Sequence, residues 1–282
     1  MGLLTVFGKT AKMKQFSRMI AALGLCFATQ AFAEPSAALI TALSDADVIF
    51  LGEIHDNPYH HKSQAAIIAA INPSAVVFEM LSVAQADKVR DLEFITAAEL
   101  DSIIGWTQSG WPSMEIYFPI FQALRDAIPY GASQPRFVMM RAYKDGAALS
   151  LGPVGSLFGL EVPLDEATFQ ARVDLQFRAH CSKMPREMIP NMIEVQRMRD
   201  ATLADAALTA LGQTGGPVVV ITGNGHARND WGAPMMAQHA DKAAKIASLG
   251  HLEGGVGNPG LYDYALVTPT IERNDPCDQI GE

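Results

Sequence analysis

The stretch that decides the fold is residues 48–57, with the sequence VIFLGEIHDN. Its first four residues are apolar, a glycine follows, and Glu53 and His55 come next. A short, wholly apolar run that ends at a glycine is typical of a strand buried on both faces of a parallel sheet. We therefore expect a strand over residues 48–51 that carries Glu53 and His55 at its carboxyl end.

Segments on either side of this strand alternate between helical and strand patterns. Residues 58–71 have helical spacing and end at Asn72-Pro73, and residues 75–78 and 217–222 are further apolar runs. We also expect strands at residues 136–142, 245–249 and 262–268, and helices at residues 83–92, 97–104, 120–127, 165–181 and 190–211. This alternation predicts an α/β fold with a mostly parallel central sheet flanked by helices.

Two segments interrupt the alternation. Residues 105–119 combine tryptophans, a tyrosine and a phenylalanine with glycine and proline, which favours an aromatic loop leading into the helix at 120–127. Residues 153–211 are helical without an intervening strand, so we expect a helical cap or insertion there. We find no tandem repeat or low-complexity linker, and residues 34–282 are expected to form a single domain.

Composition narrows the class of protein. Of the 282 residues, 49% are hydrophobic and 18% are charged, which excludes a disordered chain, a fibre and a small disulfide-stapled scaffold. The formal net charge is −9 at pH 7. Nucleic-acid partners require clustered Lys and Arg, so we expect no nucleic-acid partner.

The first 33 residues have the pattern of a leader with a signal peptide. A short basic segment at residues 13–18 precedes an apolar run at residues 19–27, and Ala31 and Ala33 are the small residues that a signal peptidase reads. We expect cleavage near Ala33 and a location in the periplasm or outside the cell. The apolar run is shorter than the ~20 residues of a membrane span. Membrane association is therefore expected only through a lipid on Cys26, although Leu25 is a poor match to a lipoprotein cleavage site.

Export changes the expected state of the cysteines. Only Cys181 and Cys277 follow the leader. In an oxidising compartment they could pair, and the sequence leaves this pairing open.

Three predicted strand ends carry side chains suited to chemistry. They are Glu53 with His55, Glu79, and His226. Parallel strands bring their carboxyl ends to one edge, where α/β proteins place ligands. Any one of these residues alone is most simply a turn residue or a hydrogen-bonded histidine, but three such strand ends together predict a functional site.

The residue types suggest two kinds of chemistry at this edge. Imidazole and carboxylate ligands suit a divalent transition metal such as Mn, Fe, Co or Zn, which would lower the pKa of bound water. Without metal, a His–Glu pair could act as a general base and its orienting group. Glu53, His55, Glu79 and His226 are the predicted catalytic residues and metal ligands.

These motifs resemble a known family. Residues 51–61 (LGEIHDNPYHH), 78–80 (FEM) and 223–227 (GNGHA) are similar to the ChaN-like haem-binding uptake proteins of the Tiki and erythromycin-esterase-like superfamily. The similarity extends over about residues 47–237 and includes Gly105-Trp106, Trp111-Pro112, residues 117–120 (YFPI), and residues 194–196 with Asp200.

The resemblance implies an α/β domain with a helical cap, a place in the bacterial envelope and a role in haem or iron acquisition. It also implies haems lying face to face at a homodimer contact, each held by a tyrosine with help from His or polar groups. The wider superfamily includes metal-dependent proteases and antibiotic esterases that use the corresponding Glu and His positions. The alternative function is therefore a metal-dependent hydrolase that uses Glu53, His55, Glu79 and His226.

Haem requires an apolar slot, an axial ligand and basic groups for its propionates. Tyr117 is the first candidate ligand and Tyr59 the second, with His60 and His61 as alternatives. The candidate propionate partners are Arg136, Arg141 and Arg228.

Overall fold

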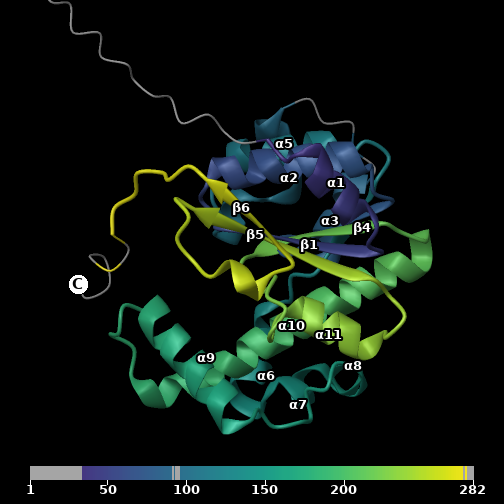
Figure 1. Ribbon diagram of the computed structural model, residues 1–282. Coiled ribbons are helices and arrows are strands. Elements are labelled where there is room, and N and C mark those ends of the chain that lie inside the picture. The colour runs from purple at the N-terminus through teal and green to yellow at the C-terminus, as the bar shows by residue number, and fades with distance from the viewer. Residues whose placement is uncertain (1–33, 91, 93–95, 276, 278–282) are drawn as a thin grey trace, which may run out of the picture. The chain divides into compact units, whose positions relative to one another are not determined.

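The computed structural model describes residues 34–90, 92, 96–275 and 277, so the predicted leader lies outside the described residues. Phe32–Glu282 forms a compact unit of its own. Its centre is a six-stranded sheet in the order β3-β2-β4-β1-β5-β6, in which all neighbouring strands are parallel (Figure 1). The strands are β1 (Val48–Glu53), β2 (Ala75–Phe78), β3 (Ile128–Gly131), β4 (Val218–Gly223), β5 (Ile246–Glu253) and β6 (Tyr264–Thr268). The predicted α/β class is therefore confirmed.

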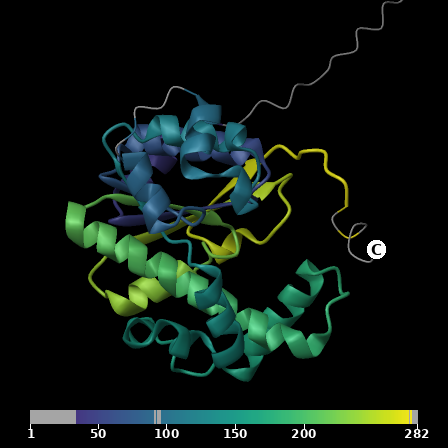
Figure 2. The ribbon, with the colours of Figure 1, turned by 180° about the vertical axis from the view of Figure 1, so that it is seen from behind.

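Helices cover both faces of this sheet (Figures 1 and 2). One face carries α1 (Ala37–Ser44), α2 (Pro58–Ile71), α3 (Val83–Arg90), α4 (Ala97–Ile104) and α5 (Met114–Ala123). The other carries α6 (Arg136–Asp145), α7 (Ala147–Leu151), α8 (Pro153–Leu157), α10 (Ile189–Thr214) and α11 (Ala233–Ala240), with α9 (Glu166–Ala179) packed on α10. Short 3-10 turns lie at η1 (Thr107–Ser109), η2 (Arg186–Met188) and η3 (Pro259–Leu261).

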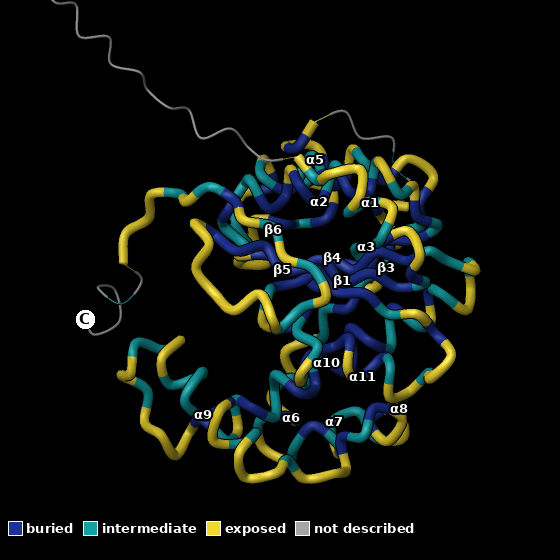
Figure 3. Tube along the Cα trace, in the orientation of Figure 1, coloured by how far each residue is buried: buried dark blue, intermediate teal, exposed yellow. Residues whose placement is uncertain are grey.

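The apolar run of β1 contributes to two cores. Ile49 and Leu51 pack with the α1–α5 layer, whereas Val48 and Phe50 pack with α10 and α11 on the opposite face. All six β1 residues are buried, as the dark central strands of Figure 3 show. Because both faces are covered, the strand shows no alternation of apolar and polar residues. This burial fixes the strand, and with it the place of the polar residues that follow.

The predicted strand at residues 136–142 is wrong, because this segment begins helix α6. Val138, Met139 and Ala142 face the core, whereas Phe137 and Arg141 are exposed. That spacing fits the helical period of 3.6 residues and not the strand period of 2. The methionines and arginines also have good helix propensity.

Two further elements differ from those expected. Strand β3 was not predicted, because Pro129 obscures its strand pattern. The proline is tolerated because β3 is an edge strand. Helix α5 begins at Met114, inside the predicted aromatic loop, because the Ser113 side chain caps it by accepting from the Glu115 backbone N–H. Burial of Tyr117 and Phe121 favours the helix despite Pro119 within it.

The segment between β3 and β4 contains helices but no strand, and its first helix starts at Arg136 and not near residue 153 as expected. A disulfide joins Cys181, just beyond α9, to Cys277 near the C-terminus, with 96 residues of sequence separation. The structure thus settles the cysteine pairing that the sequence left open. Among the described residues, no helix has the length and apolar character needed to cross a bilayer.

Candidate functional site

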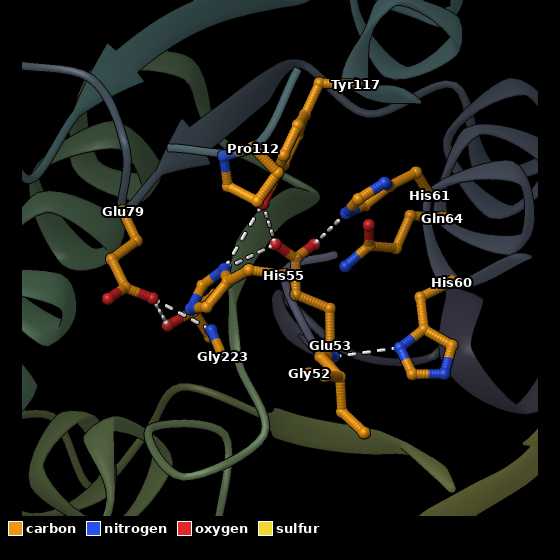
Figure 4. Close-up of polar contacts among 12 residues, drawn as sticks. Gly52, Glu53, His55, His60, His61, Gln64, Glu79, Pro112, Tyr117 and Gly223 are labelled. Carbon is orange, nitrogen blue, oxygen red and sulfur yellow. Dashed lines mark hydrogen bonds and ion pairs between the residues drawn. The ribbon is translucent and has the colours of Figure 1, made fainter. Parts of the chain in front are cut away.

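The three predicted strand ends lie together at the carboxyl edge of the sheet. Strand β4 lies between β1 and β2, with Glu53 in register with Gly223 and Phe78 in register with Ile221. Glu53, Glu79 and His226 therefore come from adjacent strands or from the turn after one of them. Figure 4 shows Glu53, His55 and Glu79 around Gly223.

Glu53 is the centre of the first group of contacts. Its side chain is fully buried, and its Oε1 accepts from the Tyr117 hydroxyl at 2.5 Å and from His55 Nδ1 at 2.8 Å (Figure 4). Its Oε2 lies 3.5 Å from His61 Nε2. Burial alone would raise the pKa of Glu53, but His61 and His55 outweigh it and hold this pKa well below its usual range. Glu53 is thus a buried carboxylate anion.

His55 links this anion to the solvent-facing part of the site. Burial would lower its pKa, but the hydrogen bond and charge of Glu53 and the charge of Glu79 raise the pKa of His55 above 6.5. Because the carboxylate only accepts, His55 Nδ1 donates, and its Nε2 points toward β4. A Cβ added at Gly223 would lie 2.9 Å from this Nε2, so a larger residue there would displace the His55 ring.

Glu79 is held by strand β4. Its Oε2 accepts from the Thr222 hydroxyl at 2.7 Å and from the Gly223 backbone N–H at 2.8 Å (Figure 4). Its Oε1 lies 3.6 Å from His226 Nε2 and 3.8 Å from the Arg199 guanidinium. Burial opposes its ionisation, but His226, His55 and Arg199 lower the pKa of Glu79 to about 2.

His226 forms a second carboxylate–imidazole pair. Its Nδ1 donates to Asp200 on helix α10 at 2.6 Å, and both residues are buried. Burial would lower the pKa of His226, but the charges of Glu79 and Asp200 raise it above 6.5. The pKa of Asp200 is raised because its burial outweighs the attraction of His226. The Glu53–His55 and Asp200–His226 pairs thus flank Glu79 from two sides.

No role was predicted for Asp200 or Arg199 from the sequence. Both lie on α10, whose buried positions near them are mostly apolar, among them Met198 and Ala201. A buried acid on such a helix face needs a partner, and this was the signal that could have identified Asp200.

The predicted haem ligands are distributed between the core and the surface. The Tyr117 phenol is buried and donates to Glu53, and its pKa is raised by burial and by the Glu53 charge. His61 is buried beside Tyr117, with ring centroids 4.0 Å apart. His60 is buried and accepts from the Ile54 N–H at 2.8 Å. Tyr59, at the start of α2, is partly exposed, so of these four it is the one at the surface.

The predicted propionate partners do not join the tyrosines. Arg136 and Arg141 are exposed on α6, across the sheet from α2 (Figure 1). Arg228 pairs with Asp230 and lies over the Trp231 ring at 3.5 Å from its centroid. The roles of these arginines stay predictions.

The described part of the chain has no group of three or more His, Cys, Asp or Glu side chains arranged to hold a metal ion. The predicted set Glu53, His55, Glu79 and His226 is instead divided among hydrogen bonds and ion pairs. Metal binding at this edge stays a prediction.

A small cavity of about 50 Å³ opens beside His226, lined among others by Arg172, Gln196 and Asp200. This volume accommodates a few water molecules.

The chain is thus a six-stranded parallel α/β domain with a helical insertion, and at its carboxyl edge the buried Glu53 lies beside the partly exposed His55. The chain matches the family described as haem-binding uptake, Tiki superfamily, ChaN over residues 39–236. It belongs to this family. The predicted resemblance is therefore confirmed.

Three solved structures are similar to the chain to different degrees. One, of cofacial haem binding to ChaN of Campylobacter jejuni, has a TM-score of 0.60 and 21% identity, and covers 83% of this chain and 91% of that chain. The type III effector HopBA1 has a TM-score of 0.46 and 12% identity, covering 84% and 94%. An erythromycin esterase mutant, EreC H289N, has a TM-score of 0.44 and 11% identity, covering 77% and 72%. No curated protein matched the chain.

Proposed function

We propose that this protein binds haem and serves haem or iron acquisition in the periplasm or outside a bacterial cell. The observation that carries the proposal is family membership over residues 39–236. The ChaN structure with cofacial haem has the same fold, and by analogy two copies of this chain would meet around a pair of haems. In this role haem is the transported cargo, and the cell would obtain its iron.

The location is supported by the disulfide between Cys181 and Cys277. Such bonds persist in oxidising compartments and are rare in the cytosol. The signal-peptide pattern of residues 1–33 points to the same compartment.

Tyr59 fits a haem ligand better than Tyr117 does. Its ring is partly exposed at the start of α2, and the Lys62 ammonium lies 5.7 Å from the ring centroid. A phenol at the surface can reach an iron, and a neighbouring cation suits a propionate. Tyr117 is buried and would have to leave Glu53 to serve as a ligand.

A haem titration tests this proposal. We expect saturable binding with a shifted Soret band, and we expect Tyr59→Phe to weaken binding by about tenfold or more, equivalent to about 1.4 kcal/mol or more. Tyr264→Phe, at a partly exposed tyrosine on edge strand β6, is the matched control and should bind as the parent does. The absence of any saturable Soret change in the parent protein would contradict haem binding. Loss in Tyr117→Phe and not in Tyr59→Phe would restore the first candidate ligand.

A second function is favoured by the two carboxylate–imidazole pairs. His55 is oriented by Glu53, and His226 by Asp200. Each imidazole is thereby prepared to take a proton from a water molecule that attacks an ester or amide carbonyl. This arrangement supports hydrolysis as the alternative function.

If the site is hydrolytic, His55→Gln and His226→Gln should each lower kcat by about 10²–10⁴-fold in an ester-hydrolysis assay. A general base must be neutral, and the pKa of both histidines is raised, so the parent rate should fall as pH drops through these raised values. His239→Gln, at an exposed histidine, should leave the rate unchanged. Analysis of the same preparation for Mn, Fe, Co and Zn tests the metal-dependent form. Equal background rates in all variants would exclude this function.

A further inference from the structure

A hollow lies along the free edge of strand β3, here called the β3-edge hollow. Its volume is about 340 Å³, and its walls are α3, β3 with the residues that follow it, and α10. Helix α3 packs on one face of the sheet and α10 on the other, so the hollow spans both layers at the end of the sheet. Its size is in the range of clefts that hold small organic molecules. None of its lining residues belongs to the site at the carboxyl edge.

Asp205 on α10 supplies an unpaired carboxylate to this hollow. The residue is partly buried, and among the residues that the structure describes no hydrogen bond or ion pair reaches it. It follows Leu203 and Ala204, which are buried in the core. Burial raises the pKa of Asp205, and no neighbouring cation offsets this effect. A partly buried charge without a partner costs free energy, and a bound cation would remove that cost.

The edge of β3 adds backbone acceptors to the hollow. The amides of Ile128 and Ala132 donate to carbonyls in or next to β2. Backbone groups of successive strand residues point to alternate sides, so the carbonyls of Pro129 and Gly131 point away from β2. Both residues line the hollow. Because proline lacks an N–H, this part of the edge presents two carbonyls and a single N–H.

Arg90 is the cation among the described lining residues, and its charge is already paired. Its guanidinium lies 3.5 Å from the Asp87 carboxylate and 5.9 Å from the centroid of the Tyr130 ring. Asp87 also lines the hollow, and the other lining residues are uncharged. The charges of Arg90 and Asp87 therefore cancel, and the charge of Asp205 is left over. The hollow is thus negative and rich in hydrogen-bond acceptors.

We propose that the β3-edge hollow binds a small aliphatic ammonium ion. The Asp205 carboxylate would pair with the ammonium group, whose other N–H groups would find the carbonyls of Pro129 and Gly131. The alkyl chain would lie against Ala86 and Ala206. An anion would face the unpaired carboxylate, and a neutral molecule would leave it unpaired. Ca²⁺ and Mg²⁺ are bound through several oxygen ligands and bound water, and neither would use the apolar wall.

Calorimetric titration with 1,4-diaminobutane at pH 7.5 and low ionic strength tests the proposal. We expect saturable binding that is weakened by salt. 1,4-Butanediol has the same chain length without the charge and should not bind measurably. Asp205→Asn keeps the shape of the side chain and removes its charge, so it should weaken diamine binding by about tenfold or more. Because Asp205 has no described partner to lose, this variant should unfold at the same urea concentration as the parent.

Asp145→Asn is the matched control, because Asp145 is an exposed aspartate on α6, outside the hollow. It should bind the diamine as the parent does. The proposal is overturned if the parent does not bind the diamine, or if butanediol binds equally well. It is also overturned if Asp205→Asn binds as tightly as the parent, or if Asp145→Asn loses as much affinity. The proposal does not depend on haem, and haem binding through Tyr59 should persist in Asp205→Asn.

Discussion

Replacing Glu53 with glutamine is expected to lower the free energy of unfolding by about 3–5 kcal/mol at pH 7, the cost of breaking a buried ion pair by removing one partner. The buried carboxylate accepts from Tyr117 and His55 and lies near His61. An amide has the same shape, but it carries no charge to balance the imidazoles. Its NH₂ group would also have to face hydrogen-bond donors. Urea unfolding at pH 7 measures the effect.

Two matched variants separate charge from packing. Glu115→Gln makes the same change at an exposed position in the first turn of α5 and should alter the free energy of unfolding by no more than about 0.5 kcal/mol. Tyr117→Phe removes one hydrogen bond to the carboxylate and should cost about 1.5–3 kcal/mol. If Glu53→Gln cost no more than Glu115→Gln, Glu53 would not be the charged centre of this site.

The sequence predicted the backbone of the site better than its side-chain contacts. The apolar runs at residues 48–51, 75–78 and 217–222 identify strands β1, β2 and β4 to within about a residue at their starts. Parallel strands bring their carboxyl ends together whatever the side chains are, so the meeting of Glu53, Glu79 and His226 followed from these runs.

The contacts that complete the site come from helices. Tyr117 on α5 and Asp200 on α10 reach Glu53 and His226 across 64 and 26 residues of sequence. Helical periodicity says which side of a helix is buried, but it does not say which strand end a given side chain meets. For the same reason Tyr117 was the first candidate haem ligand, although the structure pairs it with a buried carboxylate.

Helix α6 (Arg136–Asp145) shows a different limit of predicting secondary structure from sequence. Its exposed positions include the apolar Phe137 and Met140 beside Arg136 and Arg141, so apolar residues are not confined to its buried side. This distribution explains why a strand was expected at residues 136–142.

Stability is expected to fall by several kcal/mol between pH 6.5 and pH 4 because of two buried histidines behind the site. Burial and the neighbouring His251 lower the pKa of His60 to about 3, and burial lowers the pKa of His251 to about 4. Both rings form their hydrogen bonds in the neutral state. His60 Nδ1 accepts from the Ile54 N–H at 2.8 Å, and His251 Nδ1 donates to the Gly52 carbonyl at 2.6 Å while its Nε2 accepts from the Ser63 hydroxyl.

The direction of this change in stability with pH follows from proton linkage. The unfolded chain protonates each histidine near pH 6.5, whereas the folded protein keeps it neutral to a much lower pH. Each ring therefore contributes stability that is complete above pH 6.5 and is lost as pH falls toward the folded pKa, by about 3 kcal/mol at pH 4. His55 and His226 act in the opposite sense, because their raised pKa values favour folding below pH 6.5 and this contribution is lost as pH rises.

Urea midpoints measured from pH 7 to pH 4 test this prediction. His251→Asn removes one titrating ring and should flatten the slope by about one proton, even if it lowers stability at pH 7. A parent protein equally stable at pH 6.5 and pH 4 would show that the two buried rings accept protons without unfolding. The hydrogen bond from the Ile54 N–H to His60 would then not hold that ring neutral.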